Sequence, residues 1–498
     1  MSPAHAAHVS AEVIPPIRSS ARRWPAAPAP QPRFRLVGGA TGEADRFGFR
    51  HSPAAADAVR AFEDAVLGVA GHKPSVAADL ARATAADPGL VAAHALKGFA
   101  AVLLARAEMG APARQALADA RSALATGGGG TADEAVLVAA LERAVAGRFQ
   151  DAAVRLDALL DRNPTAFLPA KIAHSLRFMI GDAHGMLAVG ARVLDRWSRR
   201  TPGYGFLLGC HAFALEELGH LDAAERFGRR AVEIEPQDAW GLHAVSHVHE
   251  MRGRRAEGIA WIEGSRPVWS ACNNFSFHMA WHLALFRLDG GDHDEVLRIY
   301  DEEVRPAATD DFRDVANAVS LLWRLEHEGV AVGRRWDELK AIAERRRHDV
   351  TLTFAALHNL LALVATGTTD AAYELHGAME AAADRGSGDQ AEAMGTVGVE
   401  LAAAILDLSL NRAPRGDLAA LAGRLQRIGG SHAQRDVFVQ ALAGLAARRG
   451  DRAALDRILA VRRRLKRDDR FVALAETWLA QAHGTGGAGA HDRWRKAQ

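Results

Sequence analysis

A short pattern of glycine, alanine and proline recurs along the chain and limits what it can fold into. The stretches GRFQDAAVRLDALLDRNP (147–164) and GHLDAAERFGRRAVEIEP (219–236) place these residue types at the same spacing, and Gly219 and Gly253 lie 34 residues apart. Glycine permits a tight turn, alanine a close helix approach, and proline ends a helix. Because one helical hairpin cannot bury its apolar faces alone, the pattern predicts hairpins that stack into a solenoid with a concave face.

Composition agrees with such an array and excludes several classes of function. The 498 residues are 49% hydrophobic, and 61 basic residues nearly balance 60 acidic ones. This balance argues against a general nucleic-acid or membrane-surface role, which requires a concentrated positive field. With two cysteines, Cys210 and Cys272, and no apolar run of about 20 residues to span a bilayer, we expect a cytoplasmic protein without nucleic-acid or membrane partners.

The chain is too long for one compact core and is expected to divide into segments. Capping-box patterns at TADE (131–134) and SHAQ (431–434) predict helix starts. The expected segments are 1–45, a flexible leader; 46–130, N-terminal helical hairpins; 131–305, repeats with a His-rich concave face; 306–480, C-terminal helical repeats; and 481–498, a flexible tail.

Histidines concentrate in two neighbouring stretches, HAVSHVHEM (243–251) and HMAWHLALF (278–286). Residues four apart share one helix face, so each stretch aligns two imidazoles, whereas His249 points to the packing side. The first helices of adjacent repeats are neighbours in a solenoid. We therefore expect four imidazoles to converge on one spot of the concave face, those of His243, His247, His278 and His282.

The period and pattern resemble the tetratricopeptide repeat (TPR), which implies an all-α, TPR-type solenoid of stacked antiparallel helix hairpins. Four blocks narrow the resemblance: DAWGLHAVSHVHEM, WHLALF, EGVAVGRRW and GGSHAQRDVF are similar to the tetratricopeptide repeat protein 38 family, over about residues 55–470. The resemblance implies a soluble TPR-like protein and brings no established reaction. The positions that match the family's motifs are His243, His247, His249, His278, His282, His432, Gln434, Arg435 and Asp436.

Paired histidines at this spacing can bind one divalent ion from a single helix face. Two pairs supply four imidazole ligands, or three imidazoles with the carboxylate of Glu250, which makes a divalent metal such as zinc a candidate cofactor. The stretch HEMRG is not an HExxH motif, because Gly253 occupies the place of the second histidine. No C-x-x-C pair adds thiolates.

Two functions remain open at this stage. The main prediction is a concave groove that binds a partner peptide or a small ligand. The alternative is a His-lined enzyme of hydrolase type in the same groove, which works either with a metal ion or by metal-free acid–base catalysis. A buried Arg435–Asp436 pair that orients His432, a C-terminal segment that curls back over the site, and a nucleophilic Cys272 are further hypotheses. The candidate ligand-binding residues are Trp240, His243, His247, Glu250, His278, Trp281, His282, His432, Arg435 and Asp436.

Overall fold

Helices make up nearly all of the regular secondary structure in the described residues, so the all-α prediction is confirmed. The computed structural model describes residues 42–413, 416–467 and 470–484. The expected leader lies outside the described residues up to residue 41, and the expected tail does so from residue 485. Two short strands, β1 (Glu43–Ala44) and β2 (Arg50–His51), pair antiparallel, so regular structure already begins within the segment expected to be a leader.

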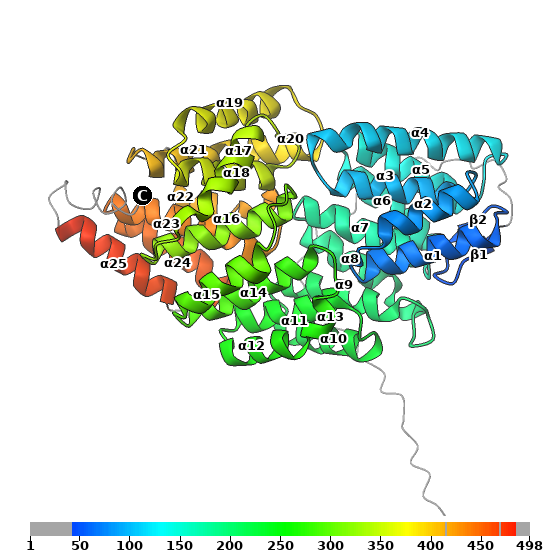
Figure 1. Ribbon diagram of the computed structural model, residues 1–498, viewed down its shortest axis with the longest axis horizontal. Helices are drawn as coiled ribbons and strands as arrows, with labels where there is room; N and C mark the ends of the chain where they lie inside the picture. The colour runs from blue at the N-terminus through cyan, green and yellow to red at the C-terminus, as the bar shows by residue number, and fades with distance from the viewer. Residues whose placement is uncertain (1–41, 414–415, 468–469, 485–498) are drawn as a thin grey trace, which may run out of the picture. The chain divides into compact units, whose positions relative to one another are not determined.

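The helices follow one another along the chain as Figure 1 shows. The first are α1 (Ala56–Ala70), α2 (Val76–Ala86), α3 (Val91–Leu103), α4 (Gly110–Thr126), α5 (Ala132–Val145), α6 (Phe149–Arg162), α7 (Phe167–Met179) and α8 (Ala183–Val193). The central ones are α9 (Tyr204–Glu217), α10 (Leu221–Ile234), α11 (Ala239–Met251), α12 (Arg255–Gly264), α13 (Arg266–Trp269), α14 (Phe275–Asp289), α15 (His293–Ile299) and α16 (Phe312–His327). The last are α17 (Trp336–Arg345), α18 (Thr353–Ala365), α19 (Thr369–Arg385), α20 (Asp389–Ala393), α21 (Val399–Ser409), α22 (Leu418–Ala422), α23 (His432–Arg448), α24 (Arg452–Leu465) and α25 (Arg470–Gly484).

A glycine in the left-handed region joins the two helices of successive hairpins. Gly219 connects α9 to α10 with a φ of 77°, and Gly253 connects α11 to α12 with a φ of 65°. Only glycine adopts this conformation at little cost, which explains why the residue recurs. The same turn occurs at intervals of 34 or 38 residues, at Gly147, Gly181, Gly219, Gly253, Gly291, Gly329 and Gly367.

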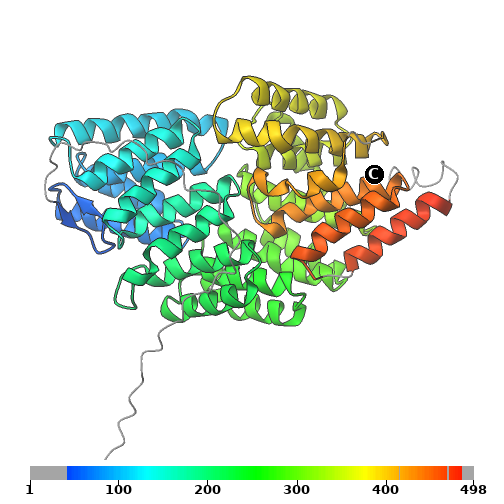
Figure 2. The same ribbon diagram turned by 180° about the vertical axis from the view of Figure 1, so that it is seen from behind.

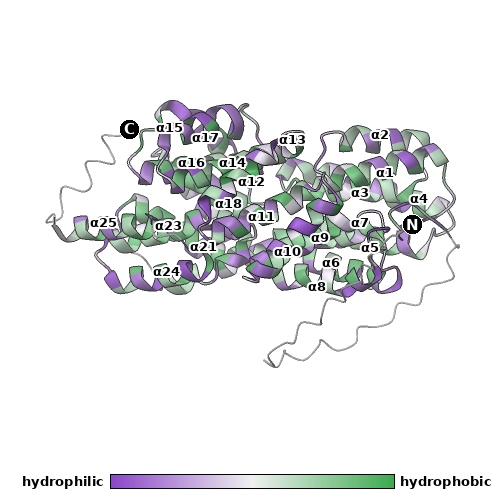
Figure 3. Ribbon diagram, turned by 90° about the horizontal axis from the view of Figure 1, so that it is seen from below, coloured by the Kyte–Doolittle hydropathy of each residue, from purple (hydrophilic) through white to green (hydrophobic). Residues whose placement is uncertain are grey.

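The other signals of the pattern also act as expected. Ala224 and Ala231 of α10 are fully buried, and α10 packs against both α9 and α11. Both predicted capping boxes form, at Thr131 and at Ser431. Hydrophobic and hydrophilic residues alternate along most helices (Figure 3), as amphipathic helices require. None of the helices in the described segments is long and apolar enough to cross a membrane.

The C-terminal helices contact the carboxyl ends of the central ones (Figure 2). The backbone N–H of His432, at the start of α23, donates to Glu217 at the end of α9, at 2.7 Å. The backbone N–H of Arg467, just after α24, donates to the carbonyl of Met251 at the end of α11, at 2.9 Å. The segment carrying GGSHAQRDVF therefore does fold back onto the His-rich repeats.

Candidate metal centre

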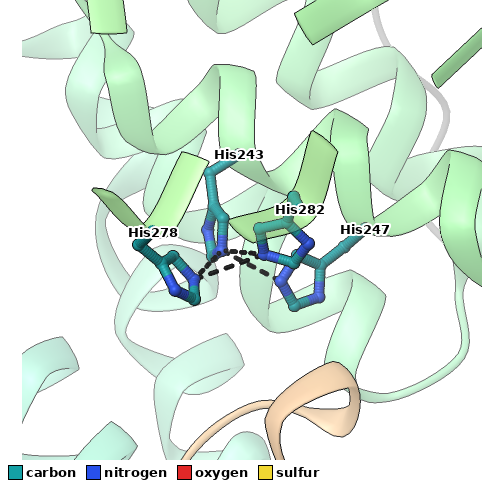
Figure 4. Close-up of side chains that lie close together, drawn as sticks. All are labelled: His243, His247, His278 and His282. Carbon is teal, nitrogen blue, oxygen red and sulfur yellow. Dashed lines mark hydrogen bonds between the residues drawn. The ribbon is translucent and has the colours of Figure 1, made fainter. Parts of the chain in front are cut away.

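The four histidines predicted to converge lie together between α11 and α14, with their rings pointing toward one another (Figure 4). The Nε2 atom of His243 lies 3.0 Å from that of His278, 3.1 Å from that of His282 and 2.9 Å from that of His247. The Nε2 atoms of His278 and His282 are 3.3 Å apart. All four residues are buried. The helical spacing thus predicted the cluster correctly.

Hydrogen bonds among the rings cannot account for this arrangement. An imidazole Nε2 carries either one proton or one lone pair, so it can satisfy one such neighbour. The Nε2 of His243 instead has three nitrogens within 3.1 Å. One metal ion at the centre would satisfy all four lone pairs: zinc–nitrogen bonds of about 2.0–2.1 Å place tetrahedral ligands about 3.3–3.4 Å apart. The observed separations are close to that value.

Oxygen atoms behind three of the rings orient them for this role. Each lies near an Nδ1 atom; where Nδ1–H donates a hydrogen bond to that oxygen, the Nε2 lone pair is free for a metal ion. Among the described residues, the Nδ1 atom of His243 has no partner, and that of His247 meets its carboxylate as an ion pair without hydrogen-bond geometry. The three pairs are His247 with Glu216 at 3.3 Å, His278 with Asn317 at 3.0 Å and His282 with Glu250 at 3.2 Å.

Burial favours the neutral form of three of the imidazoles, and a carboxylate favours the charged form of the fourth. Burial lowers the pKa of His282 to about 4 and holds the pKa of His243 well below its ordinary value. Burial also opposes the charged form of His247, but the carboxylate of Glu216 outweighs it and raises the pKa of His247. Burial alone would raise the pKa of Glu250; Lys466 and His282 outweigh burial and keep that pKa low. Neutral imidazoles with carboxylates behind them suit a divalent cation, and a bound ion would displace the proton that Glu216 favours on His247.

The two tryptophans of the prediction frame the cluster. Trp240 lies against His243 with ring centroids 4.7 Å apart, and Trp281 stacks on His278 at 5.3 Å. The indole of Trp281 is fully buried and its Nε1 donates to Ser320 at 3.1 Å. Both rings therefore hold the imidazoles in place, and neither offers an open face to a large ligand.

The predicted C-terminal residues lie outside the four-histidine cluster, and one hypothesis about them is wrong. Arg435 pairs with Glu217 at 2.7 Å and contacts Nδ1 of His432 at 3.0 Å. Asp436 pairs with Arg462 at 2.8 Å instead of with Arg435. Consecutive helical residues point about 100° apart, so adjacent side chains on α23 reach different helices.

Sequence reasoning missed several residues that support the centre. Lys466 lies 3.3 Å from Glu250 and 3.1 Å from Asp289, across the contact between the C-terminal and central helices. No local pattern marks this lysine. Asn317, by contrast, follows His278 by 39 residues, which is about one repeat. Aligning successive repeats would therefore have placed Asn317 beside His278.

Two further residues of the prediction play no part in the cluster. Cys272 bonds to the backbone carbonyls of Gly71 and Val268, and burial raises the pKa of its thiol. The hypothesis of a nucleophilic Cys272 is therefore not supported, because a nucleophile needs a lowered thiol pKa. His249 is buried on the other side of α11, 3.4 Å from Arg229, as its position in the helix predicted.

The fold and the site together define an all-α helical-repeat protein with a buried cluster of four histidines that could hold a metal ion. No family model matches this chain.

Proposed function

We propose that this chain is a TPR-type helical-repeat protein that binds one divalent transition-metal ion between α11 and α14. Zinc is the ion that we propose. One observation carries the proposal: the Nε2 atom of His243 lies within 3.1 Å of three other imidazole nitrogens. Metal coordination would satisfy a set of ring nitrogens that hydrogen bonds cannot, which supports the proposal.

The assignment to the TPR type rests on the repeat itself. Left-handed glycines recur at intervals of 34 or 38 residues, and the shorter interval is the TPR period. The proposed ligands come from the first helices of two consecutive hairpins, α11 and α14. These are the helices that line the concave face of a TPR array.

Burial favours an ion over a partner peptide as the ligand of this spot. His247 and His282 have no exposed surface, and Trp240 is 9% exposed. A peptide cannot contact side chains that the protein already covers. A metal ion fits between the four rings without displacing any of them.

The ligand set also bears on what the ion does. Four protein ligands are typical of structural sites, whereas catalytic zinc sites keep one position for water. The enzyme alternative therefore requires one ligand to leave. His278, 9% exposed, is the least buried of the four and is the candidate for that exchange.

Elemental analysis of tag-free protein tests the proposal. We expect about one metal ion per chain in the wild type and near-complete loss in the double variant His243→Ala/His278→Ala. The matched control is His249→Ala, which removes a buried histidine of the same helix outside the cluster. A wild-type protein that stays metal-free after dialysis against zinc would refute the proposal, and so would a double variant that retains the ion.

A further inference from the structure

A second group of buried polar side chains surrounds Trp240. Lys171 of α7 is 6% exposed, and its Nζ atom lies 3.8 Å from the sulfur of Cys210 and 5.1 Å from the centre of the Trp240 ring. Within the described segments, this ammonium makes no ion pair with a carboxylate. A buried cation without an anion is costly, because burial removes the water that would solvate it.

Polar atoms without partners cluster around the same tryptophan. The Nε1 atom of Trp240 and the Nε2 atoms of His72 and His174 are buried and have no hydrogen-bond partner in the part of the chain that the structure describes. The rings of His72 and His174 lie 5.7 and 6.1 Å from that of Trp240. Buried polar atoms are nearly always hydrogen-bonded in native proteins, so several such atoms in one place mark a spot where a polar ligand would gain hydrogen bonds.

The chemistry of these groups indicates the kind of ligand. An ammonium and an indole N–H can only donate, and a neutral imidazole donates through one nitrogen. Asp238 interacts electrostatically with Lys171, and burial raises the pKa of its carboxyl to about 8. Donors and a cation that forms no ion pair with a described carboxylate favour an acceptor that carries negative charge.

We propose that Lys171, Trp240 and His174 bind the anionic group of a small molecule, a carboxylate or a phosphate, on the inner face of α7, α9 and α11. Trp240 also contacts His243, at 4.7 Å between ring centroids, so this anion site adjoins the metal centre. The cation–π contact and the thiol compensate part of the burial of Lys171, and the bound anion supplies the rest. The site goes beyond the proposed metal binding and does not require the metal ion.

Thermal unfolding of the full chain in matched salts tests this inference. Sodium acetate and sodium phosphate are the probes, and sodium chloride at equal ionic strength is the reference. We expect the Tm of the wild type to rise with the concentration of acetate, of phosphate or of both, which also distinguishes the two anion classes. Lys171→Met keeps most of the apolar stem and removes the charge, so it should lose the shift, with affinity reduced at least about tenfold. Lys97→Met, at an exposed lysine of α3, is the matched control and should retain it.

Two further comparisons separate this proposal from metal binding. With EDTA present, the anion-dependent shift should persist, so a failure of metal binding leaves it intact. In chloride alone, Lys171→Met should unfold at or above the wild-type Tm, because an unpaired buried charge has been removed. The proposal is overturned if neither anion shifts the wild type, if the shift needs zinc, if it survives in Lys171→Met, or if Lys171→Met unfolds well below the wild type in chloride.

Discussion

Zinc should stabilise this protein with a dependence on concentration that the cluster itself dictates. An ion that binds only the folded chain adds RT ln(1 + [Zn]/Kd) to the free energy of unfolding. Above the Kd, each tenfold increase in free zinc therefore adds about 1.4 kcal/mol, whatever the Kd. This slope of the free energy of unfolding against the logarithm of free zinc corresponds to one bound ion, because the four Nε2 atoms form one cluster. The ligands come from helices 35 residues apart in sequence, so the unfolded chain lacks the complete site.

The assay is urea unfolding followed by circular dichroism, in buffers that set free zinc over several decades with a chelator. The wild type and His249→Ala should show the full slope once zinc exceeds the Kd. The double variant His243→Ala/His278→Ala should show a slope near zero, because two of four ligands cannot assemble the site. Its stability in EDTA provides the baseline for the comparison.

Three results would refute the reasoning. A wild-type slope near zero means that no ion is bound by the folded state alone. An equal slope in the double variant places the ion elsewhere. A slope near twice the expected value means that two ions bind, and the adjoining group of Glu216, Glu217 and His247 would then be the first place to look for the second.

Three other changes test the surroundings of the centre. Glu250→Gln removes the charge behind His282 and should weaken zinc binding about 10–100-fold, measured by competition with a chelator. An unchanged zinc affinity would contradict a supporting role for Glu250. Arg435→Met leaves Glu217 buried without its cation and should cost about 3–5 kcal/mol in urea unfolding; adding Glu217→Gln should restore most of it, and a loss that persists would contradict the pair. Burial raises the pKa of Asp238 to about 8, so its contribution to stability is full below the unfolded pKa of about 3.9 and is lost as the pH rises through about 8. Asp238→Asn should therefore gain Tm relative to the wild type between about pH 5 and pH 9, whereas parallel pH profiles would show that the carboxyl is not perturbed.

The candidate site was predictable where one helix supplies the information. The spacing of His243 and His247, and of His278 and His282, is a local property, and the repeat brings the two helices side by side. Glu250 followed from the same helical periodicity. The partners behind the other rings depend on which helix packs next, and for Lys466 on a contact between residues 216 positions apart.

The sequence alone determined the repeated hairpins and their left-handed glycine turns, because helix propensity, turn geometry and close packing are specified within one repeat. It also determined which histidine faces which side, because the rotation per helical residue is constant. Only the tertiary structure decided that Arg435 pairs with Glu217 and leaves Asp436 to Arg462. It likewise decided that Lys171 is buried without an ion pair to any carboxylate in the described segments. Such contacts join residues from distant helices, and their partners depend on how the C-terminal and central helices pack, which no local pattern specifies.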